Sequence, residues 1–403
     1  MLLLLSLAGC GGESGRATPS AGPTDAPPAV TQVVESSLDA RAVGRGLVAT
    51  HECNRCHDGT GLDAAPPNKS CVGCHLDIAE GRFAAPAAAL AEWKPHVTPL
   101  RFAPSLSAAG ILVRADWIER YLLEPHDVRP YLQPNMPRLA LDSADAKAIA
   151  IYFGTRATPS DGPAPSRDIE RGRALFTSKT CSTCHAFSGA GTPEPSPLAT
   201  TPTRDRMLAP DLRFARERLV PGRVPGYIRD PQSVKPDAAM PKLAISEQEA
   251  ADLTAFILST PLTDVAPRPS PPRLPLLDRP VGYDEVADKV LHKICWHCHS
   301  QPDFSRGDGG PGNTGGFGFK PRLLDLSSYE SIAGGYLDEK GERRSLFTPG
   351  PGGEPVLLEA LLARQKEERG GRGSVRGMPL GLPSMSPEAI QLVETWIAQG
   401  HPR

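Results

Sequence analysis

One pattern of residues that can do chemistry, Cys-x-x-Cys-His, occurs four times in this chain of 403 residues. It covers Cys53–His57, Cys71–His75, Cys181–His185 and Cys295–His299. Two cysteines at this spacing lie on one face of a helical turn, so their sulfurs can add to the two vinyl groups of one haem. The histidine that follows can then ligate the iron. The pattern therefore predicts four covalently bound haem c groups.

The predicted attachment residues are the eight cysteines of these motifs: Cys53, Cys56, Cys71, Cys74, Cys181, Cys184, Cys295 and Cys298. The predicted proximal iron ligands are the histidines that close the motifs: His57, His75, His185 and His299. Two other interpretations use the same cysteines, because the first two motifs resemble a zinc ribbon and a single CxxC is compatible with a redox dithiol. Neither needs a histidine after the second cysteine, yet every pair has one although the chain holds only 10 His. The histidines therefore favour haem.

The start of the chain predicts export and a lipid anchor. Residues 1–10 form a short apolar run that ends in Leu-Ala-Gly-Cys, which resembles a bacterial lipoprotein signal with Cys10 as the lipidated residue. The alternative is an ordinary signal peptide with an incidental cysteine. The apolar run is far below the roughly 20 residues that a spanning helix needs. Residues 11–36 are rich in Gly, Pro, Ser, Thr and Ala and predict a flexible tether.

Composition limits the classes of partner. The formal net charge is −2 and no basic run is present, so nucleic acid is not an expected partner. Of the 9 Cys, eight belong to the haem motifs and the ninth is Cys10, so none remains for a disulfide. Haem attachment of this kind takes place outside the bacterial cytoplasm, which agrees with export. We expect a membrane-anchored lipoprotein that faces the periplasm or the cell surface of a bacterium.

Two Pro-rich linkers, 157–167 and 261–280, divide the chain into three parts that each carry haem motifs and helical patterns. We call residues 37–156 the first segment, residues 168–260 the second and residues 281–403 the third. Aromatic residues make up only 5% of the chain, so haem would supply much of the apolar core. The expected fold is mainly α, with three helical haem domains in tandem, the first of them holding two haems.

An internal repeat relates the first and second segments. The matching stretches are Ala103–Leu106 with Ala209–Leu212, Tyr121–Pro125 with Tyr227–Pro231, Val128–Pro130 with Val234–Pro236, and Met136–Leu139 with Met240–Leu243. The interval from the motif to the Ala-Pro stretch spans 50 positions in the first segment and 28 in the second. The second motif falls in that longer interval, so we interpret it as an extra haem site inserted into a loop of a one-haem domain.

Helix signals close each segment. Asp142 is the expected N-cap of the last helix in the first segment. Ser246 and Glu249 form a capping box in the second segment. In the third segment, Ser386 precedes a final helix that Gly400 ends. A Gly-rich stretch, residues 307–318, has no phosphate-binding pattern, and we expect it to be a loop that covers haem.

With these features in place, the chain resembles the class I cytochrome c family. Residues 166–260 have its order of features: an N-terminal helix, CxxCH, loops, a Met before Pro and a C-terminal helix. Residues 37–156 resemble a dihaem variant. Residues 284–403 resemble cytochrome c-like modules that end in a Met-Pro pair and a helix carrying Trp-Ile-x-x-Gly, here Trp396–Gly400. The inserted motif at Cys71 departs from the family, which offers no distal ligand for it.

The distal ligands are expected to be mostly methionines. Met136 and Met240 occupy matching places in the repeat, each before Pro, and the resemblance makes them the iron ligands of the first and third haems. Filling of gaps in the core is the other role open to such methionines. Met207 is the alternative for the third haem. For the fourth haem Met378 is expected, with Met385 as the rival.

The second haem needs another ligand. His96 lies in the extra interval of the first segment and is the expected distal ligand. The alternatives are that His96 is a surface residue or that this iron is open on one face. Histidines near the motifs, His51, His292 and His297, are not expected to be ligands.

The expected function is electron transfer. The chain would be a membrane-anchored tetrahaem c-type cytochrome that passes electrons between periplasmic or membrane redox proteins, alone or as a subunit of a larger respiratory complex. No catalytic residue and no substrate turnover are expected. The alternatives are a haem enzyme of the peroxidase or reductase type, with one open iron, and a structural haem protein within a complex.

Overall fold

The computed structural model describes residues 29–97, 102–132, 136–154, 168–192, 203–266, 269–301, 311–369 and 371–403. The expected lipidation site Cys10, residues 11–28 of the tether and the linker 157–167 lie outside the described residues. Residues 29–36, predicted to be part of the flexible tether, belong instead to a helix, α1 (Ala29–Thr50). The chain forms two compact units, Met1–Asp39 and Ala40–Arg403. All four haem motifs belong to the second unit.

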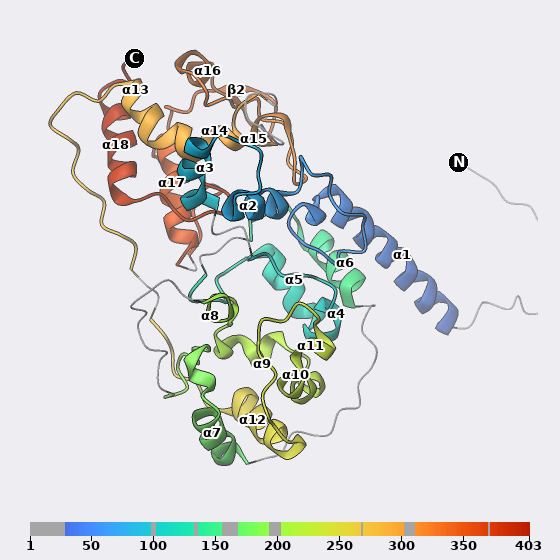
Figure 1. Ribbon diagram of the computed structural model, residues 1–403. Helices are drawn as coiled ribbons and strands as arrows, with labels where there is room; N and C mark the ends of the chain where they lie inside the picture. Colours follow the sequence, from blue (N-terminus) through green and yellow to red (C-terminus); the bar gives the residue numbers. More distant parts are fainter. Residues whose placement is uncertain are drawn as a thin grey trace, which may run out of the picture. The chain divides into compact units, whose positions relative to one another are not determined.

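The described residues are mainly helical, which confirms the predicted fold class (Figure 1). The elements that begin before or lie in the first segment are α1 (Ala29–Thr50), η1 (Cys53–Arg55), α2 (Cys71–Glu80), α3 (Ala87–Val97), α4 (Ala109–Leu112), α5 (Ala115–Leu123) and α6 (Ser143–Gly154). Those of the second segment are α7 (Ile169–Ser178), η3 (Cys181–Thr183), α8 (Arg204–Leu208), η4 (Leu212–Phe214), α9 (Ala215–Arg218), η5 (Pro221–Arg223), α10 (Val224–Arg229), α11 (Pro231–Val234) and α12 (Glu247–Ser259).

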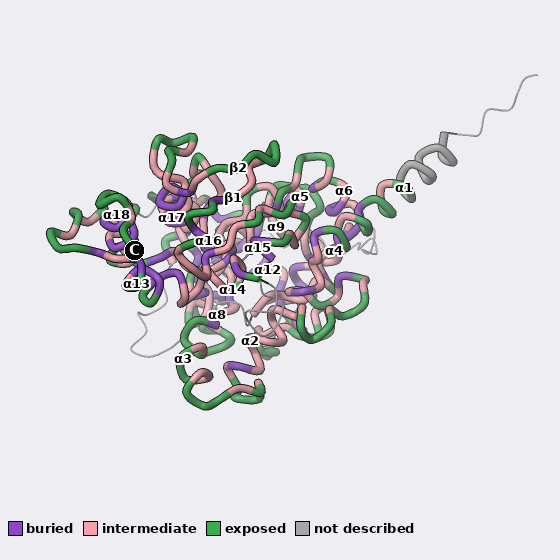
Figure 2. Tube along the Cα trace, turned by 90° about the horizontal axis from the view of Figure 1, so that it is seen from above, coloured by how far each residue is buried: buried purple, intermediate pink, exposed green. Residues whose placement is uncertain are grey.

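The third segment also contains a small antiparallel hairpin. Its elements are α13 (Tyr283–Val286), the π-helical η6 (Ala287–Cys295), α14 (Trp296–Cys298), α15 (Pro311–Thr314), α16 (Tyr329–Ala333), β1 (Tyr336–Leu337), β2 (Arg343–Arg344), α17 (Val356–Glu367) and α18 (Pro387–Ala398). Its apolar core gathers α13, η6, α17 and α18 around the fully buried Trp396. Figure 2 shows the buried stretches near α13 and α17, while β2 is exposed.

One helix crossing is repeated in the first two segments. In the second, α7 packs on α12, and a Cβ atom placed on Gly172 would collide with the carbonyl oxygen of Asp252. In the first, a Cβ atom on Gly44 of α1 would collide with the carbonyl oxygen of Ala148 on α6. Both helix pairs therefore need a glycine at the crossing because their backbones approach closely.

The predicted helix caps are present. The Ser246 hydroxyl accepts a hydrogen bond from the Glu249 amide at 3.2 Å, and the Glu249 carboxylate accepts one from the Ser246 amide at 2.8 Å. Asp142 accepts a hydrogen bond from the Asp145 amide at 2.8 Å and so caps α6. Ser386 caps α18, and Gly400 has the left-handed backbone (φ 83°) that ends it. Local sequence signals therefore set these helix ends correctly.

A short antiparallel contact joins the first and second segments. Val113 pairs with Leu219, the amide of Arg114 donates to the carbonyl of Arg218 at 2.8 Å, and the amide of Val220 donates to the carbonyl of Leu112 at 2.9 Å. In the repeat, residues 112–114 are equivalent to residues 218–220. Each segment therefore offers the same stretch to the other, as in the interface of a twofold-symmetric dimer.

The third segment contacts the first beside the first haem motif. The amide of Phe317 donates to the Glu52 carboxylate at 3.0 Å, and its carbonyl lies 3.1 Å from Nδ1 of His51. The Arg55 guanidinium lies over the Phe317 ring, 4.6 Å from its centre. The described part of the Gly-rich stretch thus packs against the residues that surround Cys53. Its coverage of haem stays a prediction.

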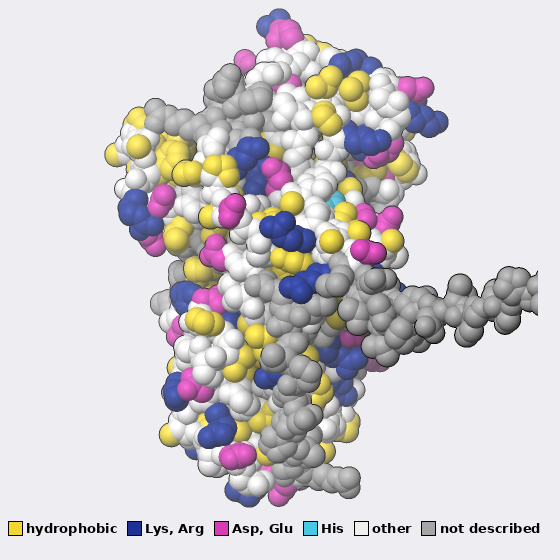
Figure 3. Space-filling model, turned by 90° about the vertical axis from the view of Figure 1, so that its right-hand side faces the viewer, with side chains coloured by type: hydrophobic (Ala, Val, Ile, Leu, Met, Phe, Trp, Pro, Cys, Tyr) yellow, Lys and Arg dark blue, Asp and Glu magenta, His cyan; other side chains and the backbone are white. Residues whose placement is uncertain are grey.

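The surface carries both signs of charge. On the face seen in Figure 3, Lys and Arg are interspersed with Asp and Glu, and apolar side chains lie between them. This mixture agrees with the small net charge of −2. Within the described ranges, every helix is too short or too polar to cross a membrane.

The close approach of α1 and α6 at Gly44 can be tested by substitution, and Gly46, two residues later in the same helix, serves as a matched control. Gly44→Ala should lower the free energy of unfolding by about 1 to 3 kcal/mol, because the new methyl group meets backbone that cannot move cheaply. A Cβ atom on Gly46 would have no neighbour within 4 Å, so Gly46→Ala should be neutral or stabilise α1 by up to about 1 kcal/mol. Urea unfolding of the haem-loaded protein would measure both, and equal effects of the two substitutions would contradict the close crossing.

Candidate functional site

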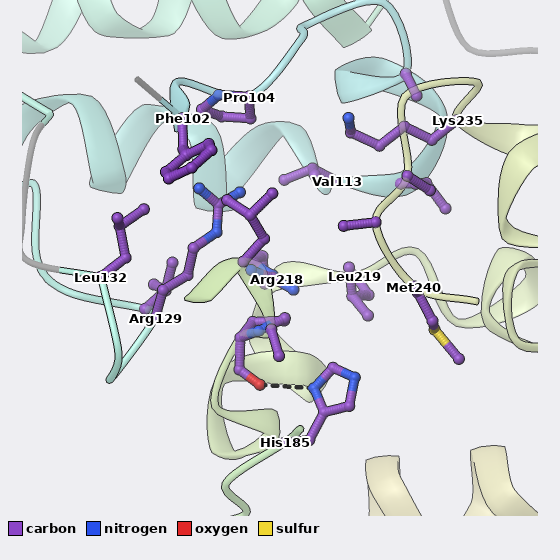
Figure 4. Close-up of a pocket in the computed structure, with 18 of the residues that line it drawn as sticks. Phe102, Pro104, Val113, Arg129, Leu132, His185, Arg218, Leu219, Lys235 and Met240 are labelled. Carbon is purple, nitrogen blue, oxygen red and sulfur yellow. Dashed lines mark hydrogen bonds between the residues drawn. The ribbon is translucent and has the colours of Figure 1, made fainter. Parts of the chain in front are cut away.

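One cavity of about 670 Å³ is lined by both the first and the third haem motif. Figure 4 shows part of its lining, including His185 and Met240. From the first segment it is lined by Cys53, Cys56, His57 and Met136; from the second it is lined by Cys181, Cys184, His185 and Met240. The two sets are equivalent in the repeat. Apolar side chains such as Ile149, Phe153, Leu253 and Ile257, from the last helices α6 and α12, complete the lining. The structure therefore brings together two sets of thiols, imidazole and thioether that were predicted to hold two haems.

The two motifs have the same local geometry. Cys53 and Cys181 each begin a single 3-10 turn, η1 or η3, and the residue before each has a left-handed backbone, with φ 49° at Glu52 and φ 57° at Thr180. In the first motif the His57 amide donates to the Cys53 carbonyl at 2.9 Å. This tight turn holds both cysteines and the histidine close together, as attachment to one haem requires.

Both proximal histidines are oriented by a backbone carbonyl. Nδ1 of His57 lies 2.8 Å from the carbonyl oxygen of Pro104, and Nδ1 of His185 lies 2.9 Å from that of Pro210, the equivalent residue. Because a carbonyl only accepts, Nδ1 must carry the proton and Nε2 keeps the lone pair that an iron needs. Burial lowers the pKa of both imidazoles, which keeps them neutral. These contacts fit a haem iron at both motifs.

The methionines differ in position. Met136 and Met240 line the shared cavity, whereas Met207 is a buried residue of α8 outside the cavity lining. In the third segment, Met385 is buried in the apolar core that includes Cys295 at its edge, and Met378 is partly buried, with its amide donating to the carbonyl of Ala360 at 2.9 Å. Ligation by Met136, Met240 and Met378 stays a prediction.

The second motif lies on α2, close to two other motifs. The Cys56 and Cys71 thiols share a hydrogen bond, which together with burial raises the pKa of Cys56 well above its usual value. Burial and, to a smaller extent, the nearby His297 of the fourth motif lower the pKa of His75 to about 4. His96 is exposed near the end of α3, so its role as distal ligand of the second haem stays a prediction.

The fourth motif sits at the end of the π-helical η6 and in α14. Burial lowers the pKa of His299 to about 4. A Cβ atom placed on Gly312 would lie 2.7 Å from Nδ1 of His299, so the α15 backbone packs directly against this ring. The ion pair between Glu92 and Lys293, 2.8 Å long, joins α3 to η6 and thus links the regions of the second and fourth motifs.

The cysteine environments do not favour the zinc and dithiol interpretations. The eight motif cysteines are free of disulfides, and among the described residues no three His, Cys, Asp or Glu side chains group to hold a metal ion. Burial raises the pKa of Cys53 and Cys181 to about 11 and that of Cys295 to about 12. Thiol exchange needs a thiolate, which this burial disfavours. Thioether attachment to haem leaves no thiol to ionise.

Two half-buried arginines of the cavity were not identified from the sequence. Arg129 and Arg218 both line the cavity, and Figure 4 shows their side chains near each other, above His185 in the view. Burial, followed by the charge of Arg129, lowers the pKa of Arg218 to about 10. One signal was visible, because Arg129 matches Lys235 in the repeat, so both segments place a cation at this position. Arg218 has no such signal, since its equivalent is Leu112.

The packing at Gly312 leads to a test of the fourth site. Gly312→Ala should displace His299 and change the axial ligation of one haem only, because the new methyl group would overlap the imidazole ring. Low-temperature EPR spectra of the oxidised protein would detect the change. Gly226→Ala is the control, because a Cβ atom there would have no neighbour within 4 Å. Identical spectra for wild type and Gly312→Ala would contradict a proximal role for His299.

Comparison with known proteins identifies one domain. The cytochrome c family model matches residues 169–261, so this part of the chain is a cytochrome c domain. Subunit CcoP of the Cbb3-type cytochrome c oxidase of Helicobacter pylori is 38% identical over 69 residues, which are 17% of this chain and 24% of the relative. The same subunit from strain ATCC 700392 / 26695 is 38% identical over 64 residues, 16% and 22% of the two chains. The matches thus cover less than a quarter of these relatives. No solved structure gives a match.

Proposed function

We propose that this protein is an electron-transfer cytochrome that binds four haem c groups through its four CxxCH motifs. The observation that carries the proposal is the shared cavity, which is lined by two Cys-Cys-His sets and by one methionine from each of the same two segments. The carbonyl contacts of His57 and His185 support it, because they leave Nε2 of each ring available. A bound haem supplies an iron that gains and loses one electron.

In the folded protein the four motifs lie next to one another in a series. The third and first motifs line one cavity, and the first and second motifs touch through Cys56 and Cys71. The second and fourth motifs are neighbours because His297 lies near His75. This order, third, first, second and fourth, differs from the order in the sequence. Contiguous redox sites favour a carrier that receives electrons at one end and releases them at the other.

Membrane attachment and assembly are further parts of the proposal. The lipoprotein signal ending at Cys10 supports an anchor on the periplasmic or outer side of a bacterial membrane. The similarity to an oxidase subunit supports a place in a respiratory complex, with other periplasmic or membrane redox proteins as donor and acceptor. No substrate of its own is needed for this role.

The ligand assignments can be tested with carbon monoxide. The wild-type protein should contain four haems by pyridine haemochrome assay, and its reduced spectrum should not change with carbon monoxide if every iron has two protein ligands. Met240→Ala should let one haem bind carbon monoxide and should lower its potential, because methionine ligation raises it. Met207→Ala is the matched control, since Met207 is a buried methionine outside the cavity lining.

Three results would revise the proposal. Fewer than four haems would remove the tetrahaem assignment. Carbon monoxide binding by one haem of the wild type would favour a haem enzyme, and the second motif would be the first place to look for the open iron. Carbon monoxide binding by Met207→Ala but not by Met240→Ala would make Met207, not Met240, the distal ligand.

The anchor has an independent test. Cys10→Ser should move the protein from the membrane fraction to the soluble fraction of the bacterial cell, because the lipidated thiol is lost. Fractionation followed by haem staining would measure the change. A variant Ser14→Ala in the same tether is the control. Retention of Cys10→Ser in the membrane fraction would contradict a lipid anchor at this residue.

A further inference from the structure

We infer that Arg129 and Arg218 form a shared carboxylate-binding site that holds the propionates of the haems attached at the first and third motifs. The inference rests on the proposed haem binding at these two motifs. It assigns Arg129 and Arg218 as residues that position the propionates of both haems and affect both redox sites.

The position of the pair comes from the contact between the segments. Arg218 ends α9 and is followed directly by Leu219, whose backbone pairs with Val113 of the first segment. Arg129 comes from the first segment, and both side chains line the cavity that contains His57 and His185. One guanidinium from each segment therefore reaches the same space.

The burial of the pair calls for an anion. Nε of Arg129 and Nε of Arg218 are buried without a hydrogen-bond partner, and neither guanidinium forms an ion pair within the described ranges. Burial is the main reason that the pKa of both side chains is lowered, and the like charge of Arg129 lowers the pKa of Arg218 further. Both side chains are half-buried, but their Nε atoms are enclosed, and an enclosed cationic group without a counter-charge is costly, so the pair calls for negative charge in the cavity.

The surrounding acids offset only part of that charge. Lys235 also lines the cavity and forms an ion pair with Asp237 at 2.5 Å. Asp127 lines it too and accepts a hydrogen bond from the backbone amide of Arg129 at 2.8 Å. The whole lining has six Lys and Arg side chains and four Asp and Glu side chains. Two phenols, Tyr121 and Tyr227, face the pair and stay neutral, because burial raises their pKa values. The cavity thus keeps an excess of positive charge.

Haem is the carboxylate source that the site itself implies. Each haem carries two propionates, and a haem tied to Cys53 and Cys56 or to Cys181 and Cys184 has to occupy this cavity. Guanidinium groups bind carboxylates through paired hydrogen bonds, which would use the unpartnered Nε atoms. A small anion from solution has the same chemistry and is the alternative source.

The consequence is a joint influence on two redox sites. A cation near an iron favours the reduced state, which carries less positive charge. Loss of one arginine should therefore lower the potentials of both the first and the third haem, although each haem is attached to a different segment. The second and fourth haems should not respond.

The test uses the full haem-loaded chain and spectroelectrochemical titration. Arg218→Leu introduces the residue that the first segment has at the equivalent position, and Arg129→Gln removes the other charge. Each should raise the ratio of oxidised to reduced haem at a fixed potential by about tenfold at two of the four haems, which corresponds to about 59 mV for a one-electron couple. Arg218→Lys should retain most of the wild-type potential. Arg229→Gln removes an exposed arginine of the same segment and should change nothing.

The outcomes separate the inference from the proposed function. Four bound haems with unchanged potentials in both Arg218→Leu and Arg129→Gln would overturn the inference and leave the haem assignment intact. Wild-type potentials that depend on sulfate concentration at constant ionic strength would also overturn it, because the pair would then bind a free anion. Absence of haem from the first or third motif of the wild type would instead refute the proposed function.

Discussion

The hydrogen bond between a histidine Nδ1 atom and a prolyl carbonyl is the constraint on which the equivalent CxxCH sites of the first two segments depend. It holds His57 against Pro104 and His185 against Pro210 at nearly the same distance, 2.8 and 2.9 Å. Each prolyl carbonyl is brought there by the loop that precedes α4 or η4. The contact determines which nitrogen carries the proton, and so it links the loops of each segment to the chemistry of its motif.

The contact between the first two segments makes them parts of one site. Equivalent stretches around Val113 and Leu219 pair with each other, and one cavity is lined by the motifs of both segments. A twofold-like arrangement also brings side chains from both segments to the same place, as it does for Arg129 and Arg218. Charges placed there act on both motifs, which no residue within a single isolated segment could do equally.

The third segment does not repeat this arrangement. Its motif ends a π-helical segment, and its histidine packs against Gly312. It contacts the first segment through the backbone of Phe317 and through the pair of Glu92 and Lys293. The inserted second motif lies in this region, with Cys71 beside Cys56 of the first motif and His75 near His297 of the fourth. Its place explains how an extra motif in a loop can be close to two others.

The sequence alone determined the features that depend on residues close together along the chain. The spacing within Cys53–His57 and its three copies, the helix caps and the repeat are local, because helical turns and covalent geometry set them directly. Only the tertiary structure decided which motifs are neighbours, since that depends on packing between distant stretches. Two consequences could not be read from the chain: Cys56 lies beside Cys71, and Arg218, whose repeat equivalent is Leu112, shares a cavity with Arg129.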